Sequence, residues 1–238
     1  MDLKGKTAVV TGGAHRLGKE FVLALADEGV NIIFTYRSAR LQVYYDTLIE
    51  VRSKGVEAIA LHCDVSDYQS VASTMWVVKQ EFEHIDILVN NASYFAKDKD
   101  VPRWQAVTRT AIDGTYYVTM EVKPLMSSGG VIINLLDNSF KRPWRDFTAH
   151  GVGKAAVAAM TRQWASDWAP AIRVNGLCLG KVLPPDNMPK EIIDEMVEHL
   201  PLGVWGKPKD ATDSLKFLIQ SDYITGEILT VDGGERWQ

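Results

Sequence analysis

The chain is poor in cysteine, with only Cys63 and Cys178 among its 238 residues. Two cysteines without a Cys-x-x-Cys spacing exclude a disulfide framework, and they match no zinc-ligand pattern. We therefore predict no metal site, and we interpret both thiols as buried apolar side chains. A chain of this length can bury a large core without such cross-links.

Long apolar runs are also missing. No stretch of about 18 apolar residues occurs, and residues 1–6, MDLKGK, lack the apolar segment of a secretory signal peptide. The formal net charge is -4, whereas nucleic-acid binding requires a basic face. We expect a cytoplasmic protein with no membrane and no nucleic acid among its partners.

No Ser/Gly/Pro-rich linker, low-complexity tract or internal repeat divides the chain. Domains of α/β type reach about 250 residues as one unit, so we expect a single domain over residues 1–238. The segment 179–202 is rich in proline. Because ligands of open α/β sheets bind beyond the strand C-termini, we predict that this segment is a substrate lid.

Short β-branched runs alternate with longer amphipathic stretches, and this period predicts strands and helices in turn. The predicted strands are Thr7–Thr11, Val30–Tyr36, Val56–Leu61, Ile85–Asn90, Val131–Leu135, Ile172–Leu177 and Glu227–Val231. The predicted helices cover residues 17–28, 39–54, 67–82, 102–126, 148–169 and 210–220. The alternation indicates a Rossmann-type α/β fold, a doubly wound parallel sheet of about seven strands with helices on both faces.

The first predicted strand ends in a glycine-rich turn, TGGAHRLG at residues 11–18, and an amphipathic helix follows directly. Glycine lets the backbone turn tightly and approach a pyrophosphate, while the helix N-terminus offers N–H groups to the anion. A strand, this turn, a helix and a second strand in succession are typical of dinucleotide binding. We therefore predict a nucleotide cofactor at this turn.

The end of the second predicted strand favours NADP(H) over NAD(H). An acidic residue there would bind a ribose hydroxyl and repel a phosphate, but this chain has Tyr36, followed by Arg37 and Ser38. Arg37 can donate charge-assisted hydrogen bonds to a 2′-phosphate. His15 and Arg16 add donors on the neighbouring turn.

Three further motifs follow the glycine turn in order: Cys63-Asp64-Val65, Asn90-Asn91-Ala92-Ser93 and Val231-Asp232-Gly233-Gly234. Over essentially the whole chain this set resembles the short-chain dehydrogenase/reductase superfamily. The resemblance implies that Asp64 binds the adenine amino group and that the Asn-Asn-Ala segment packs beside the ribose. The residues expected to hold the cofactor are Gly12, His15, Arg16, Leu17, Tyr36, Arg37, Ser38, Asp64, Val65, Asn91, Ala92, Ser93, Lys154 and Gly180.

Within the superfamily, the motifs are most similar to those of the pteridine reductases. Most members carry glycine at the position of Arg16, whereas pteridine reductases typically have arginine there. The Asn-Ala-Ser-x-Phe segment ending at Phe95, the pair Arg37-Ser38, an aspartate at Asp137 and the lid sequence 186–189 are similar too. The resemblance implies a flat heterocycle that stacks on Phe95 and accepts hydrogen bonds from Arg16.

The family's catalytic set departs from its usual form here. The family uses serine, tyrosine, a lysine four residues later and an upstream asparagine; this chain has Asp137, His150, Lys154 and Ala111. Imidazole exchanges protons near neutral pH, so an Asp137–His150 pair can supply the proton that hydride transfer requires. We therefore expect Asp137, His150 and Lys154 to be catalytic, with Arg16, Phe95, Asp137 and His150 around the substrate.

Three functional interpretations remain open at this point. The first is an NADP(H)-dependent reductase that acts on a small planar C=N or C=O substrate, such as a pteridine. The second is an NADP(H)-binding protein without turnover, and the third is a ketone or 3-oxoacyl reductase with an unusual acid. The resemblance also implies a homotetramer, assembled through the helices Trp104–Met126 and Thr148–Ala169.

Overall fold

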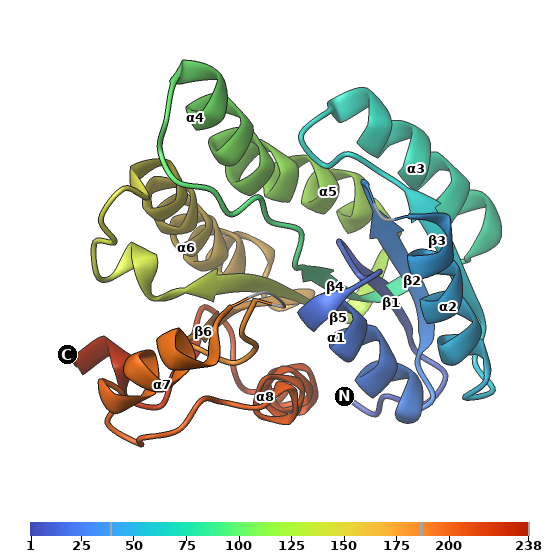
Figure 1. The fold of residues 1–238 in the computed structure, drawn as a ribbon. Helices are drawn as coiled ribbons and strands as arrows, with labels where there is room; N and C mark the ends of the chain where they lie inside the picture. Colours follow the sequence, from blue (N-terminus) through green and yellow to red (C-terminus); the bar gives the residue numbers. More distant parts are fainter. Residues whose placement is uncertain (39, 186–187, 238) are drawn as a thin grey trace.

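The described part of the chain contains one sheet of seven parallel strands, which confirms the predicted α/β class (Figure 1). The computed structural model describes residues 1–38, 40–185 and 188–237. The strand order is β3-β2-β1-β4-β5-β6-β7. The strands are β1 (Thr7–Val10), β2 (Asn31–Tyr36), β3 (Ala58–His62), β4 (Ile85–Asn90), β5 (Met126–Asp137), β6 (Ile172–Leu179) and β7 (Ile228–Val231).

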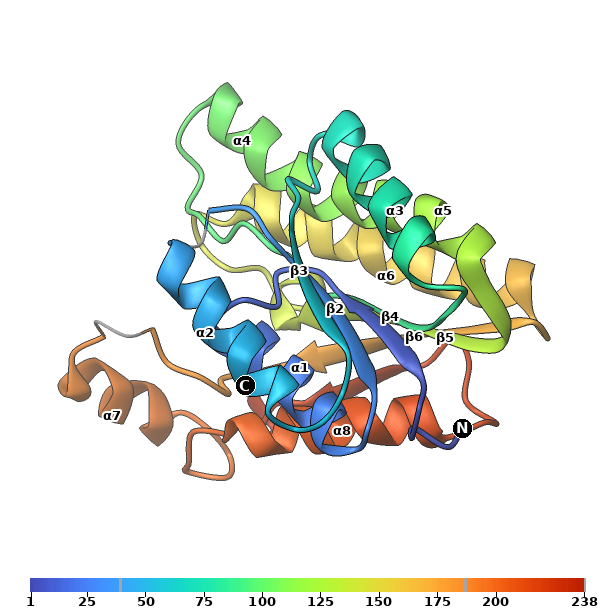
Figure 2. The same cartoon turned by 90° about the vertical axis from the view of Figure 1, so that its right-hand side faces the viewer.

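Helices cover both faces of this sheet, as Figure 2 shows. One layer consists of α1 (Arg16–Asp27), α2 (Leu41–Arg52) and α8 (Pro208–Gln220). The other consists of α3 (Tyr68–Glu81), α4 (Val101–Thr108), α5 (Gly114–Val122) and α6 (Thr148–Trp168). The described residues also form four short helical turns: η1 (Arg109–Asp113), η2 (Lys123–Leu125), η3 (Asn138–Phe140) and η4 (Glu235–Trp237).

Alternate residues of the central strands enter two separate cores. Val9 and Ile33 pack with the layer of α3, α5 and α6, whereas Val10 and Phe34 pack with α1, α2 and α8. Successive side chains of a strand point to opposite faces, so a strand covered on both sides must be apolar throughout. This explains why the strand sequences are nearly continuous apolar runs.

The crossover between β3 and β4 positions the site. The chain adds β2 and β3 on one side of β1, then returns to place β4 on the other side. Ligands of such sheets bind in the crevice where the strand order reverses, beyond the carboxyl ends of the strands. Residues that follow β1 and β4 therefore meet in space although about 80 positions separate them, as the hydrogen bond from Asn91 N to Thr11 Oγ1 illustrates.

The single helix predicted over residues 102–126 is wrong in detail. A π-helical turn, η1, interrupts it between α4 and α5, and the helix ends before Met126, which begins β5 and pairs with Ile85. A π turn adds one residue without altering the apolar character of the helix, so the hydrophobic period does not reveal it. Pro124 lies in the closing turn η2, where it lacks an N–H to continue a helix.

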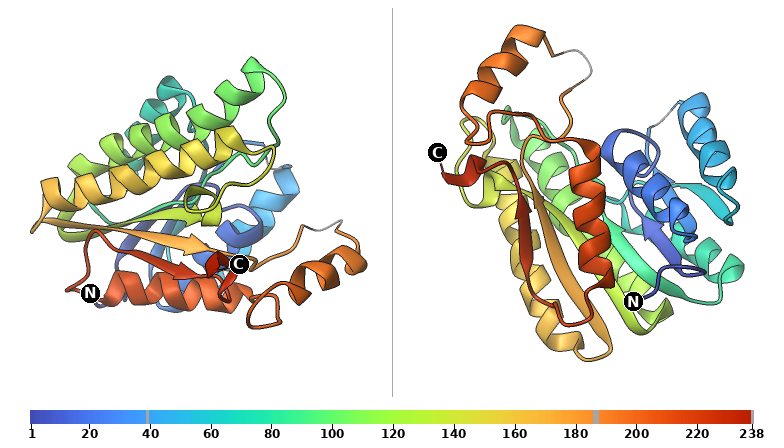
Figure 3. Two further views of the ribbon diagram at one scale, coloured as in Figure 1. Left: turned by 90° about the vertical axis from the view of Figure 1, so that its left-hand side faces the viewer. Right: turned by 90° about the horizontal axis from the view of Figure 1, so that it is seen from below.

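The predicted lid contains a helix, α7 (Lys190–Glu198), that the sequence analysis did not anticipate. Figures 2 and 3 show α7 projecting from the body of the protein, and none of its residues is buried. Asp186 and Asn187, which the sequence analysis assigned to a substrate lid, lie outside the described residues. Among the described helices, none has the length and the apolar composition needed to cross a bilayer.

Candidate functional site

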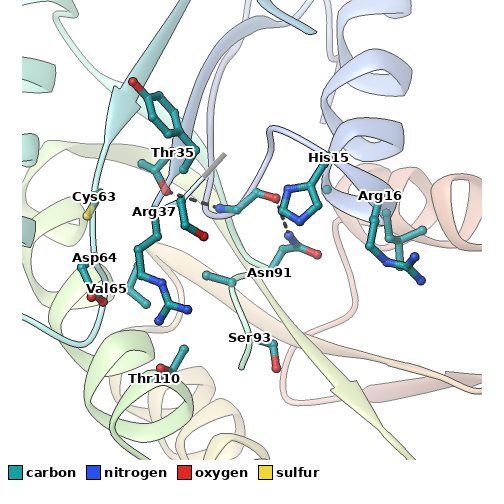
Figure 4. A pocket seen from close by; sticks show the side chains of 16 residues that line it. His15, Arg16, Thr35, Arg37, Cys63, Asp64, Val65, Asn91, Ser93 and Thr110 are labelled. Carbon is teal, nitrogen blue, oxygen red and sulfur yellow. Dashed lines mark hydrogen bonds between the residues drawn. The ribbon is translucent and has the colours of Figure 1, made fainter. Parts of the chain in front are cut away.

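A cavity of about 330 Å³ lies at the carboxyl ends of β1 to β4 (Figure 4). Every residue predicted to hold the cofactor lines it, except Lys154 and Gly180. The lining residues are Gly12, His15, Arg16, Leu17, Gly18, Thr35, Tyr36, Arg37, Ser38, Cys63, Asp64, Val65, Asn91, Ala92, Ser93 and Thr110. The sequence analysis missed Thr110, which enters from η1 and belongs to no motif.

The glycine-rich turn is shaped for a close approach of its backbone to a ligand. Gly12 has a φ of 67°, and a Cβ at Gly18 would lie 2.1 Å from the carbonyl oxygen of Gly12. Asn91 Nδ2 donates to Thr11 O at 2.8 Å, so the turn is tied to the loop after β4. Both glycines are therefore required by the packing of the turn itself.

The N-terminus of α1 suits a pyrophosphate. The side chain of His15, the N-cap residue, makes no capping hydrogen bond, and the first turn of α1 contains no acidic residue. His15 also lines the cavity, so the partial positive charge of this helix end lies beside it. Uncapped N–H groups and a glycine turn form the site in which proteins commonly hold phosphate groups.

Basic and aromatic side chains lie at and beside the end of the cavity that is next to β2. Arg37 lies directly after β2, and its guanidinium carbon is 5.5 Å from the ring centroid of Tyr94. Arg103, from α4, lies 5.7 Å from the same ring. Tyr36, the last residue of β2, stacks on Tyr44 with the ring centroids 4.0 Å apart. Of these side chains, Tyr36 and Arg37 line the cavity.

Arg16 lies on the wall of the cavity, but its guanidinium turns toward the segment that follows β6. Its NH2 group donates to the carbonyl oxygens of Leu183 at 3.1 Å and Pro184 at 3.2 Å. Figure 4 shows Arg16 and Arg37 on opposite sides of the cavity, with Asn91 between them. The two arginines therefore lie in different surroundings, although the sequence analysis assigned both to the cofactor.

A second cluster lies at the end of β5 and contains the predicted catalytic residues. His150 Nε2 is 2.7 Å from Asp137 Oδ2, and Lys154 Nζ donates to Leu135 O at 2.8 Å. The other carboxylate oxygen of Asp137 accepts from the backbone N–H and the hydroxyl of Ser139. The structure thus brings Asp137, His150 and Lys154 together from β5 and two turns of α6.

Burial and the neighbouring groups act in opposite directions on the pKa values of Asp137 and Lys154. Burial alone raises the pKa of the Asp137 carboxyl, but the hydrogen bond from His150 and the charge of Lys154 outweigh it and lower the pKa to about 2. Burial lowers the pKa of Lys154, and the nearby charge of Asp137 opposes that change. An ionised carboxylate only accepts hydrogen bonds. The Nε2 of His150 therefore carries the proton between the two side chains.

Aromatic rings surround His150. Trp144 lies parallel to the imidazole with the centroids 6.0 Å apart, and Phe95 meets it edge-on at 4.9 Å. Phe95 in turn stacks on Phe147 at 4.7 Å. His150 is only 3% exposed, whereas Phe95 is 58% exposed. Trp144 was missed as a neighbour of the imidazole, because it comes from the loop before α6 and no motif includes it.

Two further contacts fix the helix that carries His150. Asp98, from the loop after β4, accepts hydrogen bonds from Thr148 N at 2.6 Å and Ala149 N at 3.1 Å. On the other side, a Cβ at Gly153 would lie 2.8 Å from the Cβ of Ala111. Ala111 therefore packs tightly against α6 and brings no polar side chain to the cluster.

Gly180 is not part of the cavity wall. It lies against the C-terminal turn, where a Cβ would come within 2.7 Å of Asp232 Cα and 2.8 Å of Glu235 Oε2. Glu235 also forms an ion pair with Lys181 and accepts a hydrogen bond from Asn138 Nδ2 at 3.2 Å. The glycine is thus explained by packing at the base of the lid, which is a different reason from the predicted cofactor contact.

Most of this chain matches the model of a known protein family. The family is described as enoyl-(acyl carrier protein) reductase, and its model matches residues 12–235. The 3-oxoacyl-[acyl-carrier-protein] reductase of Thermotoga maritima is 30% identical, covering 98% of this chain and 99% of its own.

Two solved structures are similar over nearly the whole chain. A short-chain dehydrogenase/reductase from Serratia marcescens has a TM-score of 0.92 at 27% identity, covering 99% of this chain and 100% of that one. A blue fluorescent protein from a metagenomic library, in complex with NADPH, has a TM-score of 0.92 at 30% identity, covering 99% of each chain.

Proposed function

This chain belongs to the short-chain dehydrogenase/reductase superfamily of oxidoreductases, and on that premise we propose that it is an NADP(H)-dependent reductase. It transfers hydride to a C=O or C=N group of a small planar substrate. The observation that carries the proposal is the hydrogen-bonded pair of Asp137 and His150, with a separation of 2.7 Å, at the sheet edge that also bears the cofactor cavity.

The cavity supports NADP(H) as the cofactor. Gly12 and the uncapped start of α1 suit the pyrophosphate, Asp64 lies in the wall for the adenine, and Arg37 with Ser38 suits the 2′-phosphate. A similar structure, the metagenomic blue fluorescent protein, is a complex with NADPH, which favours the same choice. Lys154, held by Leu135 O beside the catalytic pair, would hold the nicotinamide ribose.

The chain's own residues handle the proton. When bound, the nicotinamide supplies the hydride, and negative charge develops on the substrate heteroatom. His150 delivers a proton to that atom from the doubly protonated imidazole, which leaves a neutral ring whose Nε2 proton stays in the hydrogen bond to Asp137. Asp137 holds the imidazole in place as an ionised acceptor, because its own pKa is lowered to about 2. This assigns the two residues different tasks: His150 is the acid, and Asp137 orients it.

The substrate class follows from two kinds of support. The Thermotoga relative is named as a 3-oxoacyl reductase, which favours a ketone. The exposed ring of Phe95 and its partner Phe147 offer a flat apolar surface next to His150, which suits a planar heterocycle such as a pteridine. A planar carbonyl or imine substrate meets both descriptions.

An NADP(H)-binding protein without turnover is the second candidate, and one observation favours it. The His150 side chain is only 3% exposed and lies under Trp144, so a substrate must displace part of the aromatic cluster to reach it. The deciding experiment follows NADPH absorbance with ketones, 3-oxoacyl thioesters, imines and pteridines. Oxidation with one class establishes the reductase; tight NADPH binding without oxidation of any class establishes the second candidate.

The proposal includes a cytoplasmic homotetramer that acts on a small molecule. Trp104 on α4 and Tyr116 on α5 are large apolar side chains that are 41% and 48% exposed. Together with α6 they offer apolar surface that a second copy can bury. Light scattering coupled to gel filtration tests this part: a monomeric mass at micromolar concentration contradicts it.

A further inference from the structure

We infer that Arg16 is a positioning residue that anchors the base of the lid to the glycine-rich turn, with Arg37 left to bind the cofactor phosphate. Its effect on the substrate rests on the proposed function, but the anchoring itself does not. Arg16 begins α1, at the turn that lines the cofactor cavity. Leu183 and Pro184 belong to the first part of the lid.

The geometry of the contact is that of an anchor. One NH2 group of Arg16 donates to two consecutive carbonyl oxygens, at 3.1 and 3.2 Å. These bonds join residues 167 and 168 positions apart in the chain. The guanidinium therefore connects the start of the first helix to the segment that follows the sixth strand.

The backbone of Arg16 indicates that its side chain has a specific task. Arg16 has a φ of 51°, in the left-handed region that a residue with a Cβ adopts only at an energetic cost. Glycine adopts this conformation freely, whereas a residue with a side chain does not. An arginine at this position needs a compensating interaction, and its hydrogen bonds to the lid supply one.

The lid segment needs such a contact. Val182 and Leu200 are 6% and 5% exposed, but none of the described side chains between them is buried. A stretch with few buried contacts opens at low free-energy cost. The bonds to Leu183 and Pro184 fall at the beginning of this stretch, so they set the direction in which the chain leaves the body toward α7.

Limited trypsin digestion tests the anchor without relying on turnover. Lys181 and Lys190 lie within the lid, on either side of the anchored carbonyls, and cleavage after each is mapped by mass spectrometry. Arg16→Gly keeps the backbone conformation and removes the guanidinium. Because the loss of a charge-assisted hydrogen bond is worth about tenfold or more, we expect cleavage after Lys190 to be about tenfold faster. Arg16→Lys, which cannot bridge two carbonyls in the same way, should be intermediate.

Arg37→Ala is the matched control. Each of the two variants should change one of two measured quantities, NADPH affinity or the rate of lid cleavage, and leave the other nearly unchanged. Arg37→Ala should weaken NADPH binding, measured by fluorescence titration, and leave lid cleavage at the wild-type rate. Arg16→Gly should accelerate cleavage and raise KM for the substrate, while NADPH affinity changes by less than about threefold. Thermal midpoints of both variants verify that the digestion does not report global unfolding.

Two results would overturn the inference. If Arg16→Gly is cleaved at the wild-type rate, the contact with the lid is not an anchor. If it also loses NADPH affinity to the extent of Arg37→Ala, Arg16 binds the cofactor instead. If no substrate is ever turned over, the proposed function fails, but the digestion rates still decide whether Arg16 holds the lid.

Discussion

His150 Nε2 and Asp137 Oδ2 lie 2.7 Å apart, joining the end of β5 to the first turn of α6 across thirteen positions of sequence. The two side chains form a hydrogen-bonded acid–base pair. The proton of this pair already has an acceptor before substrate binds.

Replacing His150 tests the proposed acid directly. His150→Phe should lower kcat by about 10²–10⁴, the usual contribution of general acid catalysis, with NADPH affinity preserved because His150 does not line the cofactor cavity. Stopped-flow NADPH oxidation and a separate binding titration measure the two quantities. His150→Tyr keeps a proton donor at this position and should retain more activity than the phenylalanine variant. An unchanged kcat in His150→Phe would remove His150 from the mechanism.

Asp137→Asn separates orientation from charge. The carboxyl pKa is lowered from 3.8 to about 2 in the folded protein. A lowered pKa stabilises the fold at pH values above the unfolded carboxyl pKa, by about 2 kcal/mol here, and this contribution disappears as the pH falls from about 4 to 2. Asp137→Asn should therefore lower the thermal midpoint at pH 7 and converge with the wild type near pH 2–3.

The same variant should reduce kcat, since a neutral amide accepts the hydrogen bond from His150 more weakly than a carboxylate does and orients the imidazole less firmly. If Asp137→Asn has the same thermal midpoint as the wild type at every pH, the ionised state of Asp137 does not stabilise the fold.

Arg37 is expected to determine the cofactor preference. Loss of one charge-assisted hydrogen bond costs about 1.5–3 kcal/mol, so Arg37→Ala should weaken NADPH binding by roughly 10–150-fold and NADH binding little. Parallel titrations with both nucleotides measure the ratio. Equal losses for the two cofactors would mean that Arg37 does not recognise the 2′-phosphate, and the contact with Tyr94 would then be its main role.

Phe95 is expected to act on the substrate rather than on stability. Its ring is 58% exposed, so Phe95→Ala removes little buried surface and should barely change the thermal midpoint. If a flat substrate stacks on this ring, KM should rise by about 2–10-fold, because an aromatic pair is worth about 0.5–1.5 kcal/mol. NADPH affinity serves as the control. A large loss of stability together with cofactor affinity would instead assign Phe95 to packing.

Much of the fold and of the cofactor cavity was predictable because the signals are local. Apolar runs such as Thr7–Val10 are buried on both faces of the sheet, and their continuous apolar character predicts a strand covered on both sides. The glycine turn and the residues after each strand, such as Arg37 and Asp64, reach one cavity because parallel strands all end at the same edge. Strand alternation alone therefore brings them together.

The tertiary structure decided the directions in which the side chains point. Arg16 belongs to a cofactor motif, yet its guanidinium turns to the lid, and Gly180 packs on Glu235 instead of the cavity. Trp144 stacks over His150, and Asp98 caps the helix that carries it, although neither belongs to a motif.

These contacts join segments far apart in the chain, and their geometry depends on how helices pack on the sheet. The sequence by itself determined which residues gather at the edge of the sheet. Only the packing of α6, the lid and the loop after β4 decided which of them touch, because a side chain's direction is set by neighbours that local sequence does not specify.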